Sequence, residues 1–336
     1  MSTKTSQLSQ PMENVRIMKR RDFVIKSAAM GMITPFAAHA RIFTQPATML
    51  QTGNQTANDM ICPFSKAFQW LGYDELAGFL AETGFEGIDL VVRPEGHVLP
   101  ENVERDLPAA VKAAQKQGLS IPMIVTAITD AADPFTERIL KTAAEQGVKY
   151  YRLGWYNYDG RLTIQQNLDK VRRQLEALYK LNVKYGLQGG YQNHSGANVG
   201  SPVWDLWYLI KDLDPDYMGC QYDVCHAATE GLNSWPLGFN VIASHVKHEC
   251  IKDYMYMQDN RGRWTVRFVP LGTGVVDFRR YFAMRKKHGI NGPLSIHYEF
   301  DPGDDKSLPT RERMKRIMPA VRKEVETLRS FLKGLA

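Results

Sequence analysis

Residues 87–126 read GIDLVVRPEGHVLPENVERDLPAAVKAAQKQGLSIPMIVT. The apolar run at 87–92 has the length of a buried strand, and a helical pattern follows over 107–116 until Gly118. A second apolar run occupies 121–126. A strand, a helix and a strand in this order predict two parallel strands with the helix packed outside the sheet.

The same alternation continues along the chain from residue 60. It predicts strands at 60–64, 87–92, 121–126, 150–154, 187–191, 217–224, 245–251 and 293–299. It predicts helices at 74–82, 107–116, 134–146, 164–185, 202–212, 236–243, 277–287 and 310–332, with a longer insertion at 254–276. Eight strand–helix units indicate an α/β protein with a single closed (β/α)8 TIM barrel over residues 59–336.

An open doubly wound sheet is the alternative architecture. It would normally carry a glycine-rich phosphate-binding turn after its first strand. Residues 63–73 read PFSKAFQWLGY and contain no such turn. We therefore favour the barrel and expect no nucleotide cofactor.

The first forty residues resemble an export signal. Residues 19–26 read KRRDFVIK, an uncharged run follows over 27–38, and Ala38-His-Ala40 fits a small-residue cleavage site. We predict a twin-arginine signal peptide at 1–40, a flexible leader at 41–58 and a periplasmic protein; a chance Arg-Arg in an amphipathic helix is the alternative. The uncharged run is too short for a stable membrane anchor.

Charge and cysteine content narrow the classes of partner. Six basic and two acidic residues give residues 1–40 a net charge of +4, which leaves +2 of the total +6 for the remainder. Near-neutral charge argues against nucleic acid or an acidic membrane as the main partner. Four cysteines in so long a chain are expected to be small buried hydrophobes rather than a disulfide framework, and they are Cys62, Cys220, Cys225 and Cys250. The oligomeric state stays open.

Histidines cluster at the predicted strands. Six of the seven beyond residue 40 lie on or just after a strand: His97, His194, His226, His245, His248 and His297. In the segment QYDVCHAATEG at 221–231, Asp223 and His226 are expected to end the sixth strand. Barrel enzymes place their chemistry at these carboxyl ends, so the pattern predicts one shared site.

Period-two alternation predicts which side chains point inward. His297 and Glu299 share one face, as do Gln192 and His194. Along the seventh strand, the alternating residues are His248, Cys250 and Lys252. Each could be a hydrogen-bonded core group, but inward polar groups at a barrel mouth favour ligand binding when they occur together.

Several of these segments resemble known motifs. YQNHSG at 191–196, YDVCH at 222–226, IKDY at 251–254, PLGTGVVDF at 270–278 and SIHYE at 295–299 are similar to motifs of the xylose-isomerase-like barrel superfamily. Residues 87–97 resemble its branch of sugar phosphate isomerases and epimerases, and many exported members of that branch carry twin-arginine signals. The resemblance covers residues 60–332 and implies carbohydrate chemistry on a barrel.

The resemblance also implies a divalent ion, Mn²⁺, Mg²⁺, Co²⁺ or Zn²⁺, held by Glu, Asp, His and Glu on strands five to eight. Asp223 and Glu299 match two of these ligands. The strand-five position is Gln192, and the strand-seven position is Cys250 unless a shifted register brings in His248. His226 could instead complete a set with Gln192, Asp223 and Glu299.

A site without a metal is also consistent with these residues. Lys252 could stabilise an enolate, with Glu299 or Asp223 as the base. Protons could be moved by His194, His226 and His297. Substrate could be held by Arg93, His97, Arg152, His194 and His297, and by the apolar faces of Trp155 and Tyr156.

The leading functional expectation is a sugar or keto-sugar isomerase or epimerase that moves a proton next to a carbonyl. A lyase or hydratase acting on 3-keto-glycosides or inososes is the first alternative, and a non-catalytic sugar-binding barrel is the second. Endonuclease IV-like DNA repair also occurs in the superfamily. The near-neutral charge after residue 40 and the incomplete ligand set argue against it.

Overall fold

The computed structural model describes residues 59–334, so the predicted signal and leader lie outside it. Eight parallel strands follow the order β1-β10-β7-β6-β5-β4-β3-β2. They are β1 Ile61–Pro63, β2 Gly87–Val91, β3 Ser120–Val125, β4 Tyr150–Arg152, β5 Gln188–Gln192, β6 Met218–Asp223, β7 Val246–Ile251 and β10 Leu294–Ile296. A bridge between Phe64 and Asp89 joins the first and last members of this order, which confirms the (β/α)8 barrel.

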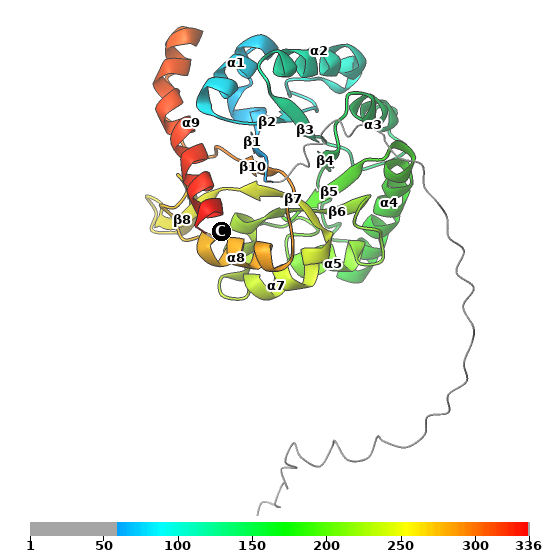
Figure 1. Cartoon of the computed structure of the whole chain (residues 1–336). Helices are drawn as coiled ribbons and strands as arrows, with labels where there is room; N and C mark the ends of the chain where they lie inside the picture. The colour runs from blue at the N-terminus through cyan, green and yellow to red at the C-terminus, as the bar shows by residue number, and fades with distance from the viewer. Residues whose placement is uncertain (1–58, 335–336) are drawn as a thin grey trace, which may run out of the picture. The chain divides into compact units, whose positions relative to one another are not determined.

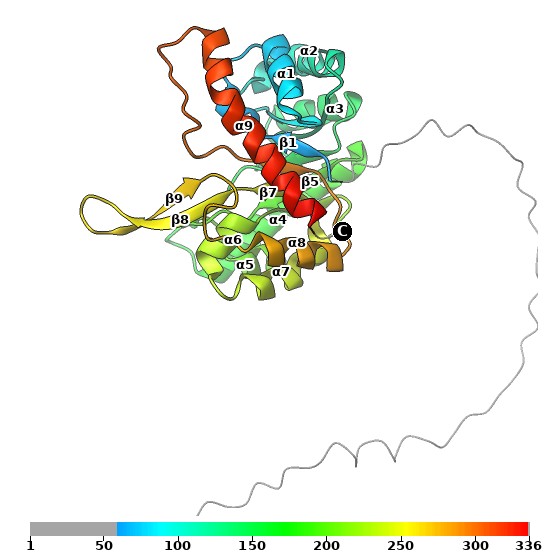
Figure 2. The same ribbon diagram turned by 60° about the vertical axis from the view of Figure 1, so that its left-hand side comes forward.

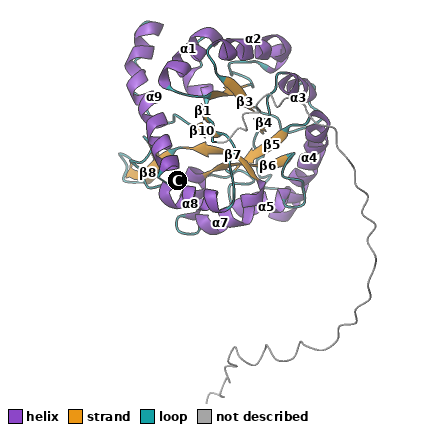
Figure 3. Cartoon of the chain, viewed as in Figure 1, coloured by secondary structure: helices purple, strands orange, loops and turns teal. Residues whose placement is uncertain are grey.

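Helices surround the strands (Figures 1 and 3). They are α1 Tyr73–Thr83, α2 Val103–Lys116, α3 Thr136–Glu145, α4 Ile164–Tyr185, α5 Val203–Ile210, α6 Val224–Gly231, α7 Trp235–Ile242, α8 Phe278–Lys287 and α9 Thr310–Lys333. The short 3-10 turns are η1 Ser65–Phe68, η2 Pro100–Asn102 and η3 Ala243–His245. The glycine after α4, Gly186, has φ 67°, a left-handed conformation that ends the helix where the sequence predicts. No described helix is long and apolar enough to cross a membrane.

Helix α6 is absent from the sequence-based prediction. Strand β6 ends at Asp223, whose carboxylate accepts the backbone N–H of His226 at 3.0 Å. This hydrogen bond caps α6, so His226 lies in the first helical turn and not at the end of a strand. His245 likewise belongs to η3 rather than to β7. An aspartate at the end of an apolar run is easily interpreted as the polar end of a strand. The same residue type can equally cap the helix that follows.

The insertion contains an antiparallel hairpin of β8 Asp253–Gln258 and β9 Trp264–Val269. Figure 2 shows it projecting from the barrel. The buried carboxylate of Asp253 anchors the loop that follows, because it accepts backbone N–H groups of Gly272 and Gly274 at 3.0 and 2.8 Å. The base of the hairpin is therefore held against the barrel mouth.

All four cysteines are free and buried, which confirms their expected role as small hydrophobes. Strands β7 and β10 pair in register, with Cys250 opposite Ser295. Just before β10, the backbone of Gly292 approaches that of Lys247 so closely that an added Cβ would lie 1.7 Å from the Lys247 carbonyl oxygen. The approach of these two strands therefore requires a glycine at 292.

We predict that Gly292→Ala lowers the free energy of unfolding by about 3 kcal/mol, because the new methyl group meets backbone and forces β10 from β7. Gly78→Ala is the matched control. Gly78 lies in α1 with no atom within 4 Å of an added Cβ, so this change should stabilise by about 0.5–1 kcal/mol. Denaturant unfolding measures both; equal stabilities for the two variants would contradict the strand approach.

Candidate active site

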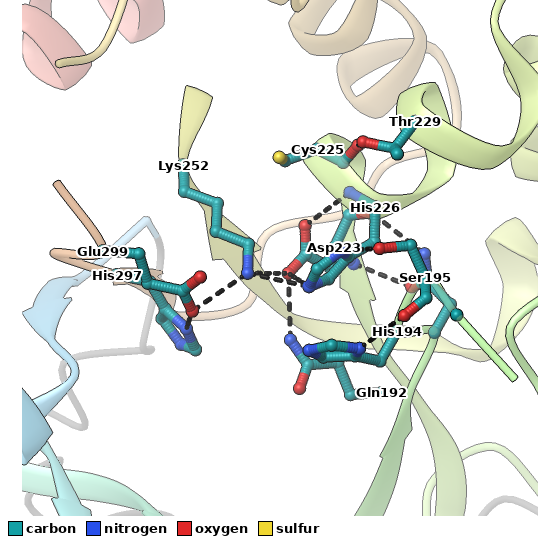
Figure 4. Close-up of polar contacts among 12 residues, drawn as sticks. Gln192, His194, Ser195, Asp223, Cys225, His226, Thr229, Lys252, His297 and Glu299 are labelled. Carbon is teal, nitrogen blue, oxygen red and sulfur yellow. Dashed lines mark hydrogen bonds and ion pairs between the residues drawn. The ribbon is translucent and has the colours of Figure 1, made fainter. Parts of the chain in front are cut away.

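Four neighbouring strands deliver charged or amide side chains to one end of the barrel (Figure 4). Gln192 and Asp223 are the last residues of β5 and β6, Lys252 directly follows β7, and Glu299 lies just after β10. The Lys252 ammonium is at their centre. Its Nζ lies 2.7 Å from His226 Nε2, 3.1 Å from Glu299 Oε1 and 3.5 Å from Asp223 Oδ2.

Asp223 is buried and held from several sides. Its Oδ2 accepts Gln192 Nε2 at 2.9 Å, and its backbone exchanges two hydrogen bonds with the Asn193 side chain. Burial opposes ionisation, but the His226 imidazole, the Lys252 ammonium and the hydrogen bond from the His226 backbone N–H bring the pKa of Asp223 to about 2. Asp223 is therefore a carboxylate at neutral pH.

Lys252 is charged although its side chain is only 2% exposed. Burial alone would lower the pKa of this amine, but the carboxylates of Asp223 and Glu299 raise it above its usual value. The ammonium must donate to His226 Nε2, so His226 is neutral and carries its proton on Nδ1, which donates to Ser195 Oγ at 2.8 Å. Burial agrees, because it lowers the pKa of His226 to about 3.

Glu299 is the more accessible carboxylate, with a side chain that is 32% exposed. Burial opposes its ionisation, but His297, 3.8 Å away, and Lys252 hold the pKa of Glu299 far below its ordinary value. The His297 ring stacks on Phe64 with the ring centroids 4.3 Å apart, and its burial lowers the pKa of His297 to about 4. Glu299 is thus ionised beside a neutral imidazole.

A cavity of about 480 Å³ opens next to this cluster. It is lined by Phe64, Lys66, Ala67, Arg93, Arg152, Trp155, Gln192, His194, Phe268, His297, Tyr298 and Glu299. Glu299 is the one carboxylate among the described residues of this lining, while Asp223 and Lys252 lie behind it. Phe268 of the hairpin covers Lys252, with Nζ 4.8 Å from the ring centroid.

The structure brings most of the predicted site residues together, but not all. Arg93, Arg152, His194 and Trp155 line the cavity. His97 does not, because its ring faces the Phe68 carbonyl oxygen at 3.2 Å. The expected sugar surface on Tyr156 is wrong: this buried ring packs on Tyr191, and its hydroxyl donates to Thr129 O at 2.6 Å.

Sequence reasoning missed several lining residues, among them Lys66 and Phe268. Lys66 lies just after β1, so its place at a strand end was the available signal. Phe268 shares the period-two pattern of Trp264 and Val266 along β9. That pattern would indicate a strand within the insertion, although not its packing over Lys252.

The residues present do not fit a divalent cation. The ammonium of Lys252 occupies the space between Asp223 and Glu299, the two carboxylates expected as ligands. Gln192 turns its N–H toward Asp223 and its Oε1 toward the Arg152 guanidinium at 3.1 Å, so its oxygen does not face the space between the two carboxylates. No group of three His, Cys, Asp or Glu side chains within residues 59–334 is arranged to hold a metal.

Of the two alternative strand-seven ligands, His248 points elsewhere, whereas the Cys250 thiol lies beside Asp223. His248 lies two residues before Cys250 on β7, and its ring stacks on Tyr150 with the centroids 5.4 Å apart, next to Gly190. Burial lowers the pKa of His248 to about 3 and raises that of the Cys250 thiol. The expected contribution of His248 to a metal site is therefore wrong, whereas Cys250 is a protonated thiol in contact with Asp223.

Comparison with known proteins identifies the family. The family model for the xylose isomerase-like TIM barrel matches residues 77–324. The chain belongs to the xylose isomerase-like TIM barrel family. No curated protein matches the chain by sequence.

Solved structures of the family share the fold. A D-allulose 3-epimerase from a Methylomonas species in complex with D-allulose is 15% identical, with a TM-score of 0.59 over 82% of this chain and 98% of that one. A 3-keto-D-glucoside 4-epimerase from E. coli is 16% identical, with a TM-score of 0.56 over 78% of this chain and 98% of that one. A xylose isomerase-like protein from Mycobacterium smegmatis in complex with magnesium is 16% identical, with a TM-score of 0.57 over 79% of this chain and 89% of that one. Identities this low establish the fold alone.

We predict that Mn²⁺ and Mg²⁺ leave the melting temperature of the protein unchanged, because the ammonium already neutralises the carboxylates that would bind them. The measurement is thermal unfolding with and without each ion after dialysis against a chelator. The variant Gln192→Glu/Lys252→Ala, which removes the ammonium and adds a carboxylate, is the comparison and should be stabilised by Mn²⁺. One Mn²⁺ per chain retained by the unaltered protein would contradict the prediction.

Proposed function

We propose that this protein is an isomerase or epimerase of a sugar or keto-sugar, and that it transfers a proton at a carbon next to a carbonyl. The observation that carries the proposal is the Glu299 carboxylate, which faces the cavity with the Lys252 ammonium 3.1 Å behind it. A carboxylate kept ionised by a fixed positive charge can remove a proton, while a cation in the cavity wall stabilises the resulting enolate.

Each residue at the cavity has a distinct task in this proposal. Glu299 accepts the proton, and the Arg152 guanidinium, which lines the cavity, stabilises the negative charge that develops on the carbonyl oxygen. Lys252 is too buried to touch the substrate, so it acts as a positioning residue that keeps Glu299 ionised. Asp223 in turn keeps Lys252 charged.

Proton exchange can take place from two sides of the cavity. Figure 4 shows Glu299 and His297 on one side of the Lys252 Nζ, and Gln192 and His194 on the other. Burial lowers the pKa of both His194 and His297, so both imidazoles are neutral at neutral pH and can accept a proton. Groups on opposite sides are the arrangement that inversion at a carbon requires.

The cavity is suited to a sugar-sized ligand. The rings of Phe64, Trp155 and Phe268 provide apolar walls, and the polar groups converge from the strand ends. The named relatives in the family include epimerases of D-allulose and of a 3-keto-D-glucoside, which supports this substrate class. The twin-arginine motif supports a periplasmic location.

We predict that Glu299→Gln slows exchange of the sugar proton by at least about a hundredfold, because a neutral amide cannot accept it. Exchange is followed by NMR in D₂O with a panel of keto-sugars. Glu312→Gln, an exposed position at the start of α9, is the control and should exchange at the normal rate. Absence of exchange with every sugar would refute the proposal, whereas an enone product would identify a lyase.

We predict that Lys252→Met moves the acidic limb of the pH–rate profile upward. In the unaltered protein, Lys252 helps to hold the pKa of Glu299 far below 4.5, so Glu299 stays a base throughout mildly acidic pH. Without the ammonium, burial raises that pKa, and activity should fall as the pH drops through a limb near or above 4.5. A reduced rate with an unchanged profile would show that Lys252 has a structural role alone.

A further inference from the structure

The cavity wall carries two arginine side chains that form no salt bridge with a carboxylate among the described residues. Within residues 59–334, the Arg93 side chain makes no hydrogen bond or salt bridge, although Asp89 and Glu95 attract it. Its guanidinium lies 6.0 Å from the Phe64 ring centroid. Arg152 donates to the neutral Gln192, stacks over Trp155 at 4.3 Å and has a buried Nε with no partner. Lys66 adds a third cation to the same wall.

The two guanidinium groups lie close enough to repel each other. Burial and the neighbouring charge of Arg93 together lower the pKa of Arg152 to about 10, against the attraction of Asp89. Arg152 is therefore still a cation at neutral pH. Two neighbouring guanidinium groups with no salt bridge to a carboxylate are unfavourable, so the arrangement favours a further negative group between these side chains.

The nearest acidic groups supply only part of the opposite charge. Asp89 attracts both arginines and Glu95 attracts Arg93, but neither carboxylate forms a salt bridge with them. Asp89 instead accepts a hydrogen bond from Ser295 Oγ at 2.7 Å. Burial raises the pKa of Asp89 to about 6. The Glu299 carboxylate is already paired with Lys252. The wall thus keeps an excess of positive charge.

We propose that Arg93 and Arg152, together with Lys66, form a subsite for an anionic group, a carboxylate or a phosphate, of an acidic sugar. This inference rests on the proposed function, because it names the class of substrate that the same cavity takes. Guanidinium groups match both anions, since each oxygen pair can accept two parallel N–H donors. A neutral sugar would leave the two charges uncompensated.

An anion in this subsite also changes the strength of the base. The positive charge near Glu299 favours its ionised form. Glu299 is therefore a weak base in the free protein. An anion bound to Arg93 and Arg152 offsets part of this positive field, so the pKa of Glu299 rises when substrate is present. Binding of an acidic sugar therefore strengthens the group that removes its proton.

The test is calorimetric titration of the full-length protein with three small probes of matched size: glycerol, glycerate and glycerol 3-phosphate. We expect at least one anion to bind at millimolar concentration and glycerol not to bind. Preference for glycerate indicates a sugar acid, and preference for glycerol 3-phosphate indicates a sugar phosphate. Binding of neither anion, or equal binding of glycerol, would overturn the proposal.

Variants assign the binding to the subsite. Arg93→Met should weaken anion binding about tenfold or more, because it removes a charge-assisted hydrogen bond. Arg279→Met is the matched control: it removes the same charge from an exposed position on α8 and should bind normally. Unchanged affinity in Arg93→Met, with a normal unfolding curve, would also overturn the proposal.

The outcome is separable from that of the proposed function. Anion binding without any proton exchange in D₂O would leave the subsite standing and remove the isomerase proposal. Proton exchange on a neutral keto-sugar by a protein that binds neither anionic probe would support the isomerase proposal and remove the anion subsite.

Discussion

A buried ammonium between two carboxylates is the interaction on which the site depends. Transferring Lys252 and Asp223 from water into the barrel is unfavourable, and each is tolerated because the other remains charged. Asp223 is further held by Gln192 and by the Asn193 side chain, and Gln192 is oriented by Arg152. These hydrogen bonds join the carboxyl ends of β4, β5, β6 and β7, and Glu299 adds the end of β10. The charges of Lys252, Asp223 and Glu299, with the hydrogen bonds to them, thus hold the ends of these strands together.

A covalently attached cation differs in kind from an exchangeable metal ion. Its position is set by the β7 backbone, it brings a single charge, and it cannot be lost to a chelator. The site therefore offers proton transfer in a positive field rather than direct coordination of a sugar oxygen by an ion. The strongly depressed pKa of Glu299 follows from that field, and a negatively charged ligand on the Arg93 and Arg152 side would moderate it.

Much of this arrangement follows from the sequence, and the remainder depends on contacts that one sequence does not show. Apolar runs and glycine stops predict the barrel because strand length and helix termination are local properties, and α4 spans the predicted residues 164–185. The meeting of Asp223, Lys252 and Glu299 follows from parallel strands ending at one rim. Helix α6 was missed because its cap, Asp223, reads as the end of a strand. Lys252 occupies the space expected for a metal. This position depends on side-chain packing across three strands, and sequence periodicity cannot reveal such packing.

The most direct test of this account is a crystal structure of the protein soaked in Mn²⁺, with anomalous diffraction to locate the ion. The account predicts the Lys252 Nζ between the carboxylates of Asp223 and Glu299, and no anomalous peak at that position. A manganese ion bound by Asp223 and Glu299, with the Lys252 side chain turned away, would contradict it.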